Sequence, residues 1–504
     1  MTRPMNDLPI AVIGGGPVGL AAAAHLIERG LRPIVFEAGP RVGHSMREWG
    51  HVRMFSPWRY VVDHAARRAL AGSGWVPPAE DALPTGREVV ERYLEPLASL
   101  PAIRSALRLG TRVTAVSRQL VDKVKTPARD AMPFVLRTVD ADGAEHDVLA
   151  RAVIDASGSW FQPNPMGANG LPARGEPAHA QRIRYGIPDI LGSERTRYAG
   201  RRTLVVGTGH SAINSLLALV ELMDAHDTTR VFWGMRRSAP GNAFGGGEGD
   251  ALPARAALGT RLRAEVDAGN VRILTGLQIG AVEETGGALV VRDVEGNQVA
   301  LVDEVIVATG ARPDLDLLRE MRLDLDSALE SPRALGPLID PNEHSCGSVR
   351  PHGAFELEQP ERNLFIVGMK SYGRAPTFLL ATGYEQVRSV AAYVAGDYAA
   401  AREVMLDLPE TGVCNVTIGG NDASAGCCGV EPRAEPRKET EMAEMNAVAA
   451  QPASACCGGP APKEAEACCV KDADAKAAGE SGCGCGLPKV AQSNAPAAST
   501  SCCG

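Results

Sequence analysis

Aromatic residues are scarce in this 504-residue chain, at 4% of the total, whereas apolar residues together make up an ordinary 45%. A core of this composition has to be built from Ala, Val, Leu and Ile. Uninterrupted apolar runs of about 18–20 residues, the signature of a membrane-spanning helix, are also missing. The apolar stretch near the N-terminus is broken by glycines and a proline, and no small-residue cleavage site follows it. These absences predict a cytoplasmic protein without a secretory signal or a membrane partner.

Charge of one sign does not dominate either. The chain has 52 Lys and Arg against 60 Asp and Glu, which gives a formal net charge of -8. Phosphate backbones attract clustered cations, so this balance argues against nucleic acid as a partner. A chain of 504 residues exceeds one ordinary core, and about 100–200 residues per domain predicts two or three domains.

Cysteine is absent before Cys346, and ten of the twelve cysteines lie from Cys427 onward. A disulfide framework would spread its cysteines through the fold, so this distribution excludes one. The cysteines instead mark a separate, thiol-rich C-terminal segment.

The first ordered pattern that the sequence does contain is a strand, a glycine-rich turn, a helix and a second strand. We expect the strands at Pro9–Ile13 and Pro33–Glu37 and the helix at Leu20–Arg29, with the turn at residues 14–19 between the first strand and the helix. Together they predict a βαβ unit.

The turn carries the G-x-G-x-x-G fingerprint of dinucleotide binding. Gly14 permits the tight turn, Gly16 lets the backbone approach a pyrophosphate, and Gly19 allows the helix to pack closely on the strand. Pro17 lies at the helix start, where free N–H groups and the helix dipole favour phosphate. Glu37 follows the second strand, and its carboxylate suits ribose hydroxyls but repels a 2′-phosphate. The turn therefore favours FAD or NAD over NADP; the alternative is an incidental glycine turn.

A second copy of the pattern begins near Arg202. We expect strands at Leu204–Val206 and Val231–Trp233, a turn at residues 207–212 and a helix at Ile213–Met223. Alanine as the third small residue is permitted by the fingerprint. Two copies of one pattern are far more informative than either copy alone.

The second strand of the second copy is followed by basic residues, where the first copy has an acidic one. Arg236 and Arg237 follow its second strand, and two guanidinium groups can hold a 2′-phosphate bidentately. We therefore assign FAD to the first turn and NADPH to the second; a solvated basic loop is the alternative for the arginines. His210 either touches the cofactor phosphates or packs on the helix as a turn residue. The expected NADPH contacts are Gly207, Gly209, His210, Ser211, Ala212, Arg236 and Arg237.

Three further strands each end in a turn, at Ala152–Asp155, Glu304–Val307 and Leu364–Val367, and a helix follows at Thr382–Ala395. The predicted fold class is α/β, with two Rossmann-like dinucleotide-binding domains and a disordered C-terminal tail. The expected boundaries are 1–170 and 331–409 for the two parts of the FAD domain, 171–330 for the inserted NADPH domain, and 410–504 for the tail.

From about residue 8 to 400 the chain resembles the two-dinucleotide-binding-domain flavoproteins and, among them, the flavin-containing monooxygenases. The features that carry the resemblance are Gly43 and Trp49 after Glu37, Pro84–Arg87 before a helix with Tyr93, Gly175 and His179 of an F-x-G-x-x-x-H stretch, and Ser211–Asn214. Ala173 stands where that stretch has its aromatic residue.

The resemblance implies an FAD- and NADPH-dependent oxidoreductase in which NADPH reduces FAD, and the reduced flavin reacts with O2 or passes electrons to an acceptor. Cysteine-free sequence before Cys346 excludes the flavin-facing dithiol of the disulfide reductases from this core. A Gly-Asp pair of thioredoxin-reductase-like members is replaced by Gly368-Met369. No side chain need act as acid or base, so we expect no particular catalytic residue. Further expected flavin contacts are Arg47, Trp49, Val113, Ser157, Gly158, Gly368 and Met369.

The C-terminal cysteines come in pairs, which suit soft, thiophilic ions such as Cu(I), Zn(II) or trivalent arsenic on a flexible chain. The spacings fit no standard zinc module, and incidental cysteines in a low-complexity tail are the alternative. Tails of this kind resemble those of flavoproteins linked to arsenic resistance, which implies an arsenical or another thiophilic substrate. The expected metal ligands are Cys427, Cys428, Cys456, Cys457, Cys468, Cys469, Cys483, Cys485, Cys502 and Cys503.

Three functions remain open. The first is an NADPH-dependent flavin monooxygenase or oxidase acting on a small soft substrate related to sulfur, arsenic or a metal. The second is an NADPH-dependent reductase that passes electrons to the tail thiols or to a metal bound there. The third is a metal- or metalloid-binding or sensing protein that uses the flavoprotein core as a scaffold.

Overall fold

The computed structural model describes residues 4–244, 253–343, 349–376 and 378–406 of the chain. All twelve cysteines, and with them the expected metal ligands and the predicted disordered tail, lie outside these residues.

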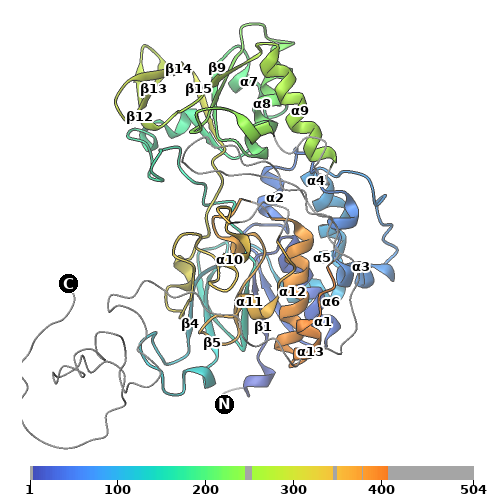
Figure 1. Ribbon diagram of the computed structural model, residues 1–504. Helices are drawn as coiled ribbons and strands as arrows, with labels where there is room; N and C mark the ends of the chain where they lie inside the picture. Colours follow the sequence, from blue (N-terminus) through green and yellow to red (C-terminus); the bar gives the residue numbers. More distant parts are fainter. Residues whose placement is uncertain (1–3, 245–252, 344–348, 377, 407–504) are drawn as a thin grey trace, which may run out of the picture. The chain divides into compact units, whose positions relative to one another are not determined.

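A parallel five-stranded sheet forms the centre of the first lobe, with the order β16-β7-β1-β2-β3 (Figure 1). Its strand β16 comes from near the end of the described chain and pairs with β7, so the sequence between them is an insertion. The strands are β1 (Ile10–Ile13), β2 (Pro33–Phe36), β3 (Leu107–Arg108), β7 (Ala152–Asp155) and β16 (Leu364–Ile366).

Side chains of β1 alternate between two cores, as a strand covered on both faces requires. Ile10 and Val12 face the core that α1 and α12 cover, whereas Ala11 and Ile13 face a second core beneath a three-stranded antiparallel sheet. That small sheet was not predicted from the sequence. It consists of β4 (Arg112–Arg118), β5 (Phe134–Val139) and β6 (Glu145–Ala150).

Helices α1 (Pro17–Glu28) and α12 (Leu380–Val394) lie side by side although they come from opposite ends of the described chain (Figure 1). The four alanines at positions 21–24 are buried, and their small side chains let α1 approach the sheet closely. Helix α1 begins three residues earlier than predicted, because Pro17 is well suited to its first turn. The scarcity of aromatic residues is thus met by small-residue packing.

The second lobe repeats this plan around a parallel sheet with the order β11-β10-β9-β15-β8. Helices α8 (His210–Met223) and α9 (Pro253–Asp267) contribute to one of its cores. The small sheet of β12 (Ile279–Thr285), β13 (Ala288–Asp293) and β14 (Gln298–Val302) contributes to the other. The parallel strands are β8 (Ile183–Tyr185), β9 (Arg202–Val206), β10 (Arg230–Gly234), β11 (Val271–Leu274) and β15 (Glu304–Val307).

The predicted α/β class with two Rossmann-like sheets is confirmed, and the exact domain boundaries stay a prediction. The predicted helix around Tyr93 is α4 (Gly86–Val89), a π-helical turn (Val90–Leu94) and α5 (Glu95–Ser99) in succession. A capping box between Thr85 and Glu88 starts it. The remaining α-helices are α2 (His44–Glu48), α3 (His64–Ala71), α6 (Pro101–Ala106), α7 (Arg195–Tyr198), α10 (Gly336–Ile339), α11 (Ala354–Leu357) and α13 (Tyr398–Arg402).

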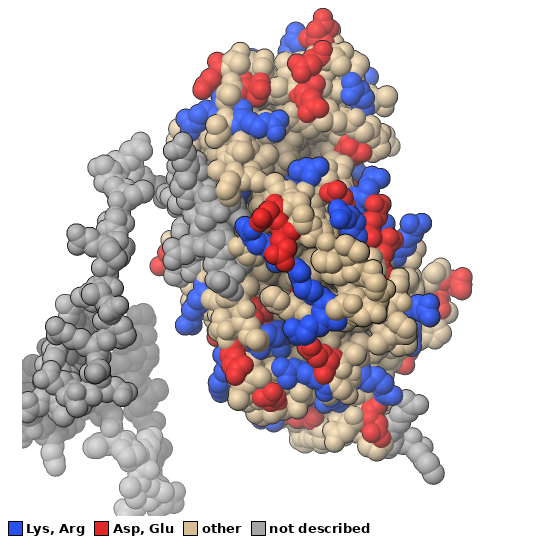
Figure 2. Space-filling model, turned by 90° about the vertical axis from the view of Figure 1, so that its right-hand side faces the viewer, with Lys and Arg blue, Asp and Glu red and all other residues tan. Residues whose placement is uncertain are grey.

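Basic and acidic side chains are interspersed over the described part of the face in Figure 2. Among the described helices, none is both long enough and apolar enough to cross a bilayer.

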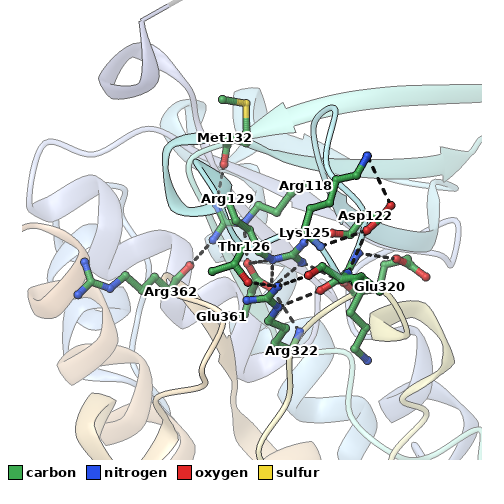
Figure 3. Close-up of polar contacts among 12 residues, drawn as sticks. Arg118, Asp122, Lys125, Thr126, Arg129, Met132, Glu320, Arg322, Glu361 and Arg362 are labelled. Carbon is green, nitrogen blue, oxygen red and sulfur yellow. Dashed lines mark hydrogen bonds and ion pairs between the residues drawn. The ribbon is translucent and has the colours of Figure 1, made fainter. Parts of the chain in front are cut away.

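A buried ion cluster fastens the β4–β6 sheet to the start of β16. Figure 3 shows Arg118 and Arg129 converging on Glu361, whose two carboxylate oxygens each accept a guanidinium hydrogen bond of 2.7 Å. Arg322 adds its backbone N–H to the same carboxylate. Burial alone would raise the pKa of the Glu361 carboxyl, but the hydrogen bonds from Arg129 and Arg118 outweigh burial and lower that pKa. Because Glu361 precedes β16, the cluster lies at the end of the sheet opposite the glycine turn.

Replacing Glu361 with Gln should lower the free energy of unfolding by about 3–5 kcal/mol, because two buried guanidinium groups lose their carboxylate. The urea midpoint measures this loss. A carboxyl with a depressed folded-state pKa stabilises fully above its unfolded pKa of about 4.3, and the contribution disappears as the pH falls through the folded pKa. The difference between parent and variant should therefore shrink in acid.

The matched control is the exposed Arg137–Asp147 pair on β5 and β6, whose side chains are 52% and 48% exposed. Asp147→Asn should cost at most about 1 kcal/mol. Equal losses in the two variants would contradict a stabilising role of the Glu361 cluster.

Candidate cofactor sites at the two glycine turns

The first glycine turn follows β1 and is shaped by two close backbone approaches. Gly14 has a φ of +105°, and a Cβ there would lie 2.6 Å from the carbonyl oxygen of Ala156. A Cβ on Gly19 would lie 1.9 Å from the Gly14 carbonyl oxygen. A Cβ on Gly16, by contrast, would meet nothing within 4 Å. The fold itself thus requires Gly14 and Gly19, whereas Gly16 faces open space of the kind that a pyrophosphate needs.

The start of α1 is open to an anion. Gly16 is the N-cap residue, and no side chain caps the helix. Pro17 occupies the first turn and has no N–H of its own. The free N–H groups of the first turn and the positive end of the helix dipole therefore face the space in front of Gly16.

Glu37 lies at the mouth of this turn, as the fingerprint predicts. Its Oε2 accepts the Gly15 N–H and its Oε1 accepts the Gly39 N–H, both at 2.8 Å. Each carboxylate oxygen has a second lone pair. Those lone pairs remain suited to the hydroxyls of an adenosine ribose.

Two more turns meet the first one because β1, β7 and β16 run parallel and end at the same edge. A Cβ on Gly14 would lie 3.0 Å from the Cα of Ser157, and a Cβ on Gly368 would lie 3.3 Å from the Val18 side chain. A Cβ on Gly158 would meet nothing within 4 Å. The Ser157–Gly158 and Gly368–Met369 turns therefore stand beside the open cradle, where the sequence predicts flavin contacts.

Behind these turns lies a buried ion pair that the sequence analysis missed. The Lys370 ammonium donates to Asp155 Oδ2 at 2.6 Å and to Ser157 Oγ at 3.1 Å. Ser157 Oγ also lies 2.6 Å from Asp155 Oδ1. The neighbouring turn is closed by Gln386, whose side-chain oxygen accepts the Gly368 N–H at 2.7 Å. The polar group at this corner is thus Lys370, one residue after the Met369 that replaces the expected aspartate.

Three of the expected flavin residues are engaged with the protein itself. Arg47 donates to the Glu95 carboxylate at 2.7 Å and to the Val42 carbonyl oxygen at 3.2 Å. The ring of Trp49 lies 6.4 Å from that of Trp160. Val113 is buried in the core beneath the β4–β6 sheet. Flavin contacts of Arg47, Trp49 and Val113 stay predictions.

The second turn, after β9, divides its small residues in the same way. Gly207 has a φ of +130°, and a Cβ there would lie 2.2 Å from the Ala308 carbonyl oxygen. A Cβ on Gly209 would meet nothing within 4 Å, and Ala212 packs fully buried in the core behind. Ser211 belongs to the first turn of α8, which no side chain caps. This turn, too, faces open space at Gly209, beside a helix start without a side-chain cap.

Arg236 and Arg237 follow β10 directly beside this turn. The Gly207 N–H donates to the Gly234 carbonyl oxygen at 3.1 Å, which fixes the end of β10 against the turn. Arg236 is exposed, and within the described part of the chain its guanidinium makes one long contact, of 3.4 Å, with the Ala168 carbonyl oxygen. Arg237 is half-buried, and its carbonyl oxygen accepts the Gly276 N–H. Both residues thus follow the end of β10 that is hydrogen-bonded to the second turn.

His210 is the first residue of α8, and its ring lies 5.0 Å from that of Phe55. It therefore packs against an aromatic side chain, and a contact with the cofactor phosphates stays a prediction.

The structure explains why the F-x-G-x-x-x-H stretch has glycine at position 175. A Cβ on Gly175 would lie 2.1 Å from the Val282 carbonyl oxygen of β12. Ala173, in place of the aromatic residue, is buried in the adjoining core. His179 lies 4.0 Å from Glu284. The described residues contain no group of three or more His, Cys, Asp or Glu side chains that could hold a metal.

Comparison with known proteins places this geometry in a family. The model of the family described as pyridine nucleotide-disulphide oxidoreductase matches residues 11–334. Ferredoxin–NADP reductase 1 of Cupriavidus necator is 24% identical over 391 residues, which cover 76% of this chain and 87% of that protein. FAD-dependent monooxygenase nscC of Neosartorya fischeri is 26% identical over 277 residues, 49% of this chain and 62% of that protein.

Two solved structures show the same fold. Bacillithiol disulfide reductase Bdr (YpdA) of Bacillus cereus superposes with a TM-score of 0.57 and 19% identity, over 77% of this chain and 99% of that chain. A flavin monooxygenase of Stenotrophomonas maltophilia has a TM-score of 0.51 and 20% identity, over 77% of this chain and 98% of that chain.

The open space in front of Gly16 and Gly209 gives a test of the two cradles. Both residues have negative φ values, so alanine fits their backbone, and the added methyl group projects into the cradle. Gly16→Ala should leave the thermal unfolding of the FAD-free protein unchanged and raise the Kd for FAD about tenfold or more, which is about 1.4 kcal/mol. Gly209→Ala should keep the FAD content and raise the KM for NADPH.

Gly14→Ala serves as the contrasting variant, because its methyl group strikes backbone and its φ is positive. It should lower the stability of the protein without any cofactor present. A Gly16→Ala protein that binds FAD as tightly as the parent would show that the pyrophosphate lies elsewhere.

Proposed function

The chain belongs to the pyridine nucleotide-disulphide oxidoreductase family and is a flavin- and NADP(H)-dependent oxidoreductase, and we propose that it works as an NADPH-dependent monooxygenase or oxidase on a small, soft substrate. The observation that carries the assignment of the two cofactors is the opposite charge at the two cradles. Glu37 stands at the first, and Arg236 and Arg237 stand at the second. A carboxylate repels a 2′-phosphate and guanidinium groups bind it, so NADPH is excluded from the first cradle and favoured at the second.

Bound FAD supplies acceptance of hydride from NADPH and the subsequent reaction with O2 or another acceptor. The residues of the chain bind and orient. In the first cradle, Glu37 holds the adenosine ribose while the N–H groups of α1 hold the pyrophosphate. In the second, α8 holds the pyrophosphate of NADPH, and Arg236 and Arg237 hold its 2′-phosphate.

The monooxygenase proposal is supported by the distribution of thiols. Every cysteine of the chain lies at or after Cys346, outside the described residues, and the two nucleotide turns contain none. Among the residues that the structure describes, no dithiol therefore lies beside these turns to take electrons from the flavin. The sequence similarity to the FAD-dependent monooxygenase nscC also supports the monooxygenase proposal. In such a reaction one NADPH and one O2 are consumed, with one oxygen atom entering the substrate and the other leaving as water.

The proposal of a soft, thiophilic substrate rests on the cysteines of the C-terminal tail. Its paired cysteines, from Cys427 to Cys503, suit thiophilic ions or metalloids such as Zn(II) or trivalent arsenic. A tail that binds such species would raise their concentration near the protein that holds the flavin.

A reductase is the second candidate, and the similarity to ferredoxin–NADP reductase favours it. Here electrons would leave the flavin for the tail thiols, once oxidised to disulfides, or for a metal bound by them. NADPH consumption by the full-length, FAD-loaded protein, in air and in the absence of oxygen, separates the two candidates. A monooxygenase or oxidase should consume oxygen with NADPH and stop without it. Anaerobic NADPH consumption matched by newly titratable thiols would favour the reductase instead.

Replacing both Arg236 and Arg237 with Ala should lower kcat/KM for NADPH roughly 10- to 100-fold, because the 2′-phosphate loses its charge-assisted hydrogen bonds. The kcat/KM for NADH should change little, so the ratio of the two specificity constants is the measurement. Arg230 provides the control, since it is an exposed arginine at the opposite end of the same strand β10. A double variant that keeps the NADPH preference, or an Arg230→Ala variant that loses it equally, would refute the assignment.

Binding of a thiophilic ion by the tail is tested on the full chain with the ten paired tail cysteines, from Cys427 to Cys503, replaced by Ser. Zn(II) and arsenite, titrated separately under reducing conditions, should bind the parent and not the variant. The variant should retain NADPH oxidation in air, because the two cradles are unchanged. Equal ion binding by both proteins would remove the tail from the proposal.

A further inference from the structure

The Asp155–Lys370 ion pair is unusual because it is completely buried and yet is hydrogen-bonded to an exposed residue, Ser157. Both charged side chains are 0% exposed. Ser157, which both of them contact, is exposed at the edge of the open cradle. Burying two charges is costly, and apolar residues of similar volume often serve a core equally well. The pair therefore calls for a role beyond packing β7 against the segment after β16.

The donors and acceptors around Ser157 can be assigned without ambiguity. An ammonium only donates and a carboxylate only accepts. The Ser157 hydroxyl must therefore donate its proton to Asp155 Oδ1 and accept an N–H from Lys370. Asp155 Oδ1 also accepts the backbone N–H of Ser157 at 3.1 Å, so the turn and the hydroxyl are fixed together.

This bonding leaves Ser157 Oγ with one lone pair and no proton to give. A group that meets it from the cradle has to be a donor. The phosphate oxygens of FAD only accept, whereas the hydroxyls of its ribityl chain can donate. The hydrogen-bond pattern thus excludes the phosphates as the partner of Ser157. The adenosine ribose, which also carries donors, is assigned to Glu37, and the ribityl hydroxyls lie at the other end of the pyrophosphate.

We propose that Ser157 accepts a hydrogen bond from a ribityl hydroxyl of FAD and that Lys370 is a positioning residue that acts through Asp155 to hold Ser157 in this acceptor state. The proposal rests on the assignment of FAD to the first cradle and deepens it. It also explains how this chain recognises the cofactor at a corner where Met369 offers no carboxylate. Lys370 itself does not reach the cofactor, because no part of its side chain is exposed.

The test measures FAD affinity, the visible spectrum of bound FAD and the stability of the FAD-free protein in three variants. Ser157→Ala keeps the ion pair and should raise the Kd for FAD roughly 3- to 10-fold, as expected for one lost hydrogen bond, with a smaller loss of stability than Lys370→Met. Lys370→Met leaves the Asp155 charge buried and unpaired, so it should lower both stability and affinity. The double variant Asp155→Leu with Lys370→Met removes both charges and should regain stability while its FAD affinity stays at or below that of Ser157→Ala.

Analogues of FAD with a 2′-, 3′- or 4′-deoxyribityl chain identify the donor. One of these analogues should bind the parent more weakly than FAD does. The same analogue should bind Ser157→Ala with the affinity it has for the parent. Glu361→Gln is the matched control, since it breaks an equally buried ion cluster at the other end of the same sheet. It should lower stability while FAD binding and the flavin spectrum at low temperature remain those of the parent.

A folded double variant with parental FAD affinity and spectrum would show that the pair is only structural and would overturn the proposal. If the double variant does not fold, Ser157→Ala decides, and parental affinity there overturns the proposal equally. A parent chain that binds no FAD would overturn the function proposed above together with this inference. A parent that binds FAD no better than the variants overturns the inference alone.

Discussion

The close contact between Gly14 and the Ala156 carbonyl oxygen is the constraint on which the first site depends. A side chain of any size at position 14 would separate the end of β1 from the end of β7. With glycine there, the turns after β1, β7 and β16 gather at one edge of the parallel sheet, and the start of α1 points into the space between them. Gly207 and Ala308 repeat this contact in the second lobe, so one steric solution serves both nucleotides.

Backbone geometry is thus shared, and in the function proposed here selectivity between the cofactors comes from the side chains that follow the second strand of each unit. Glu37 is held by two backbone N–H groups and cannot easily leave the mouth of its cradle. Among the described residues, the Arg236 guanidinium makes one long contact, with the Ala168 carbonyl oxygen, and its side chain is exposed, so it can turn toward a phosphate. The fixed Glu37 carboxylate suits a neutral ribose and repels a 2′-phosphate. The exposed Arg236 guanidinium suits a charged 2′-phosphate.

The sequence was sufficient to predict features that depend on neighbouring residues. Both βαβ units, their glycine turns and the position of Glu37 follow from local spacing, and the structure has them there. The Asp155–Lys370 pair could not be predicted, because its members lie 215 residues apart and meet only when β16 returns to the sheet. The β4–β6 sheet was missed although β5 alternates regularly, because burial along β4 does not follow a period of two and the first half of β6 is exposed. Whether Arg47 or Trp49 reaches the flavin is a matter of side-chain direction, on which spacing is silent.

Two buried ion clusters of the first lobe, those of Glu361 and of Lys370, lie at opposite ends of one sheet, and the placement has a physical reason. In the middle of the sheet every backbone group is paired and every side chain meets apolar neighbours, so a charge there would find no partner. At the ends, backbone groups and loops supply hydrogen bonds, as Met132 and Arg322 do for the Glu361 cluster. The two clusters differ in what they leave exposed. The Glu361 carboxylate ends in bonds to the protein, whereas the Asp155–Lys370 pair ends at the hydroxyl of Ser157, an exposed residue at the edge of the cradle. Burial of charge alone therefore does not separate a structural cluster from a functional one; the exposed end of the hydrogen-bond chain does.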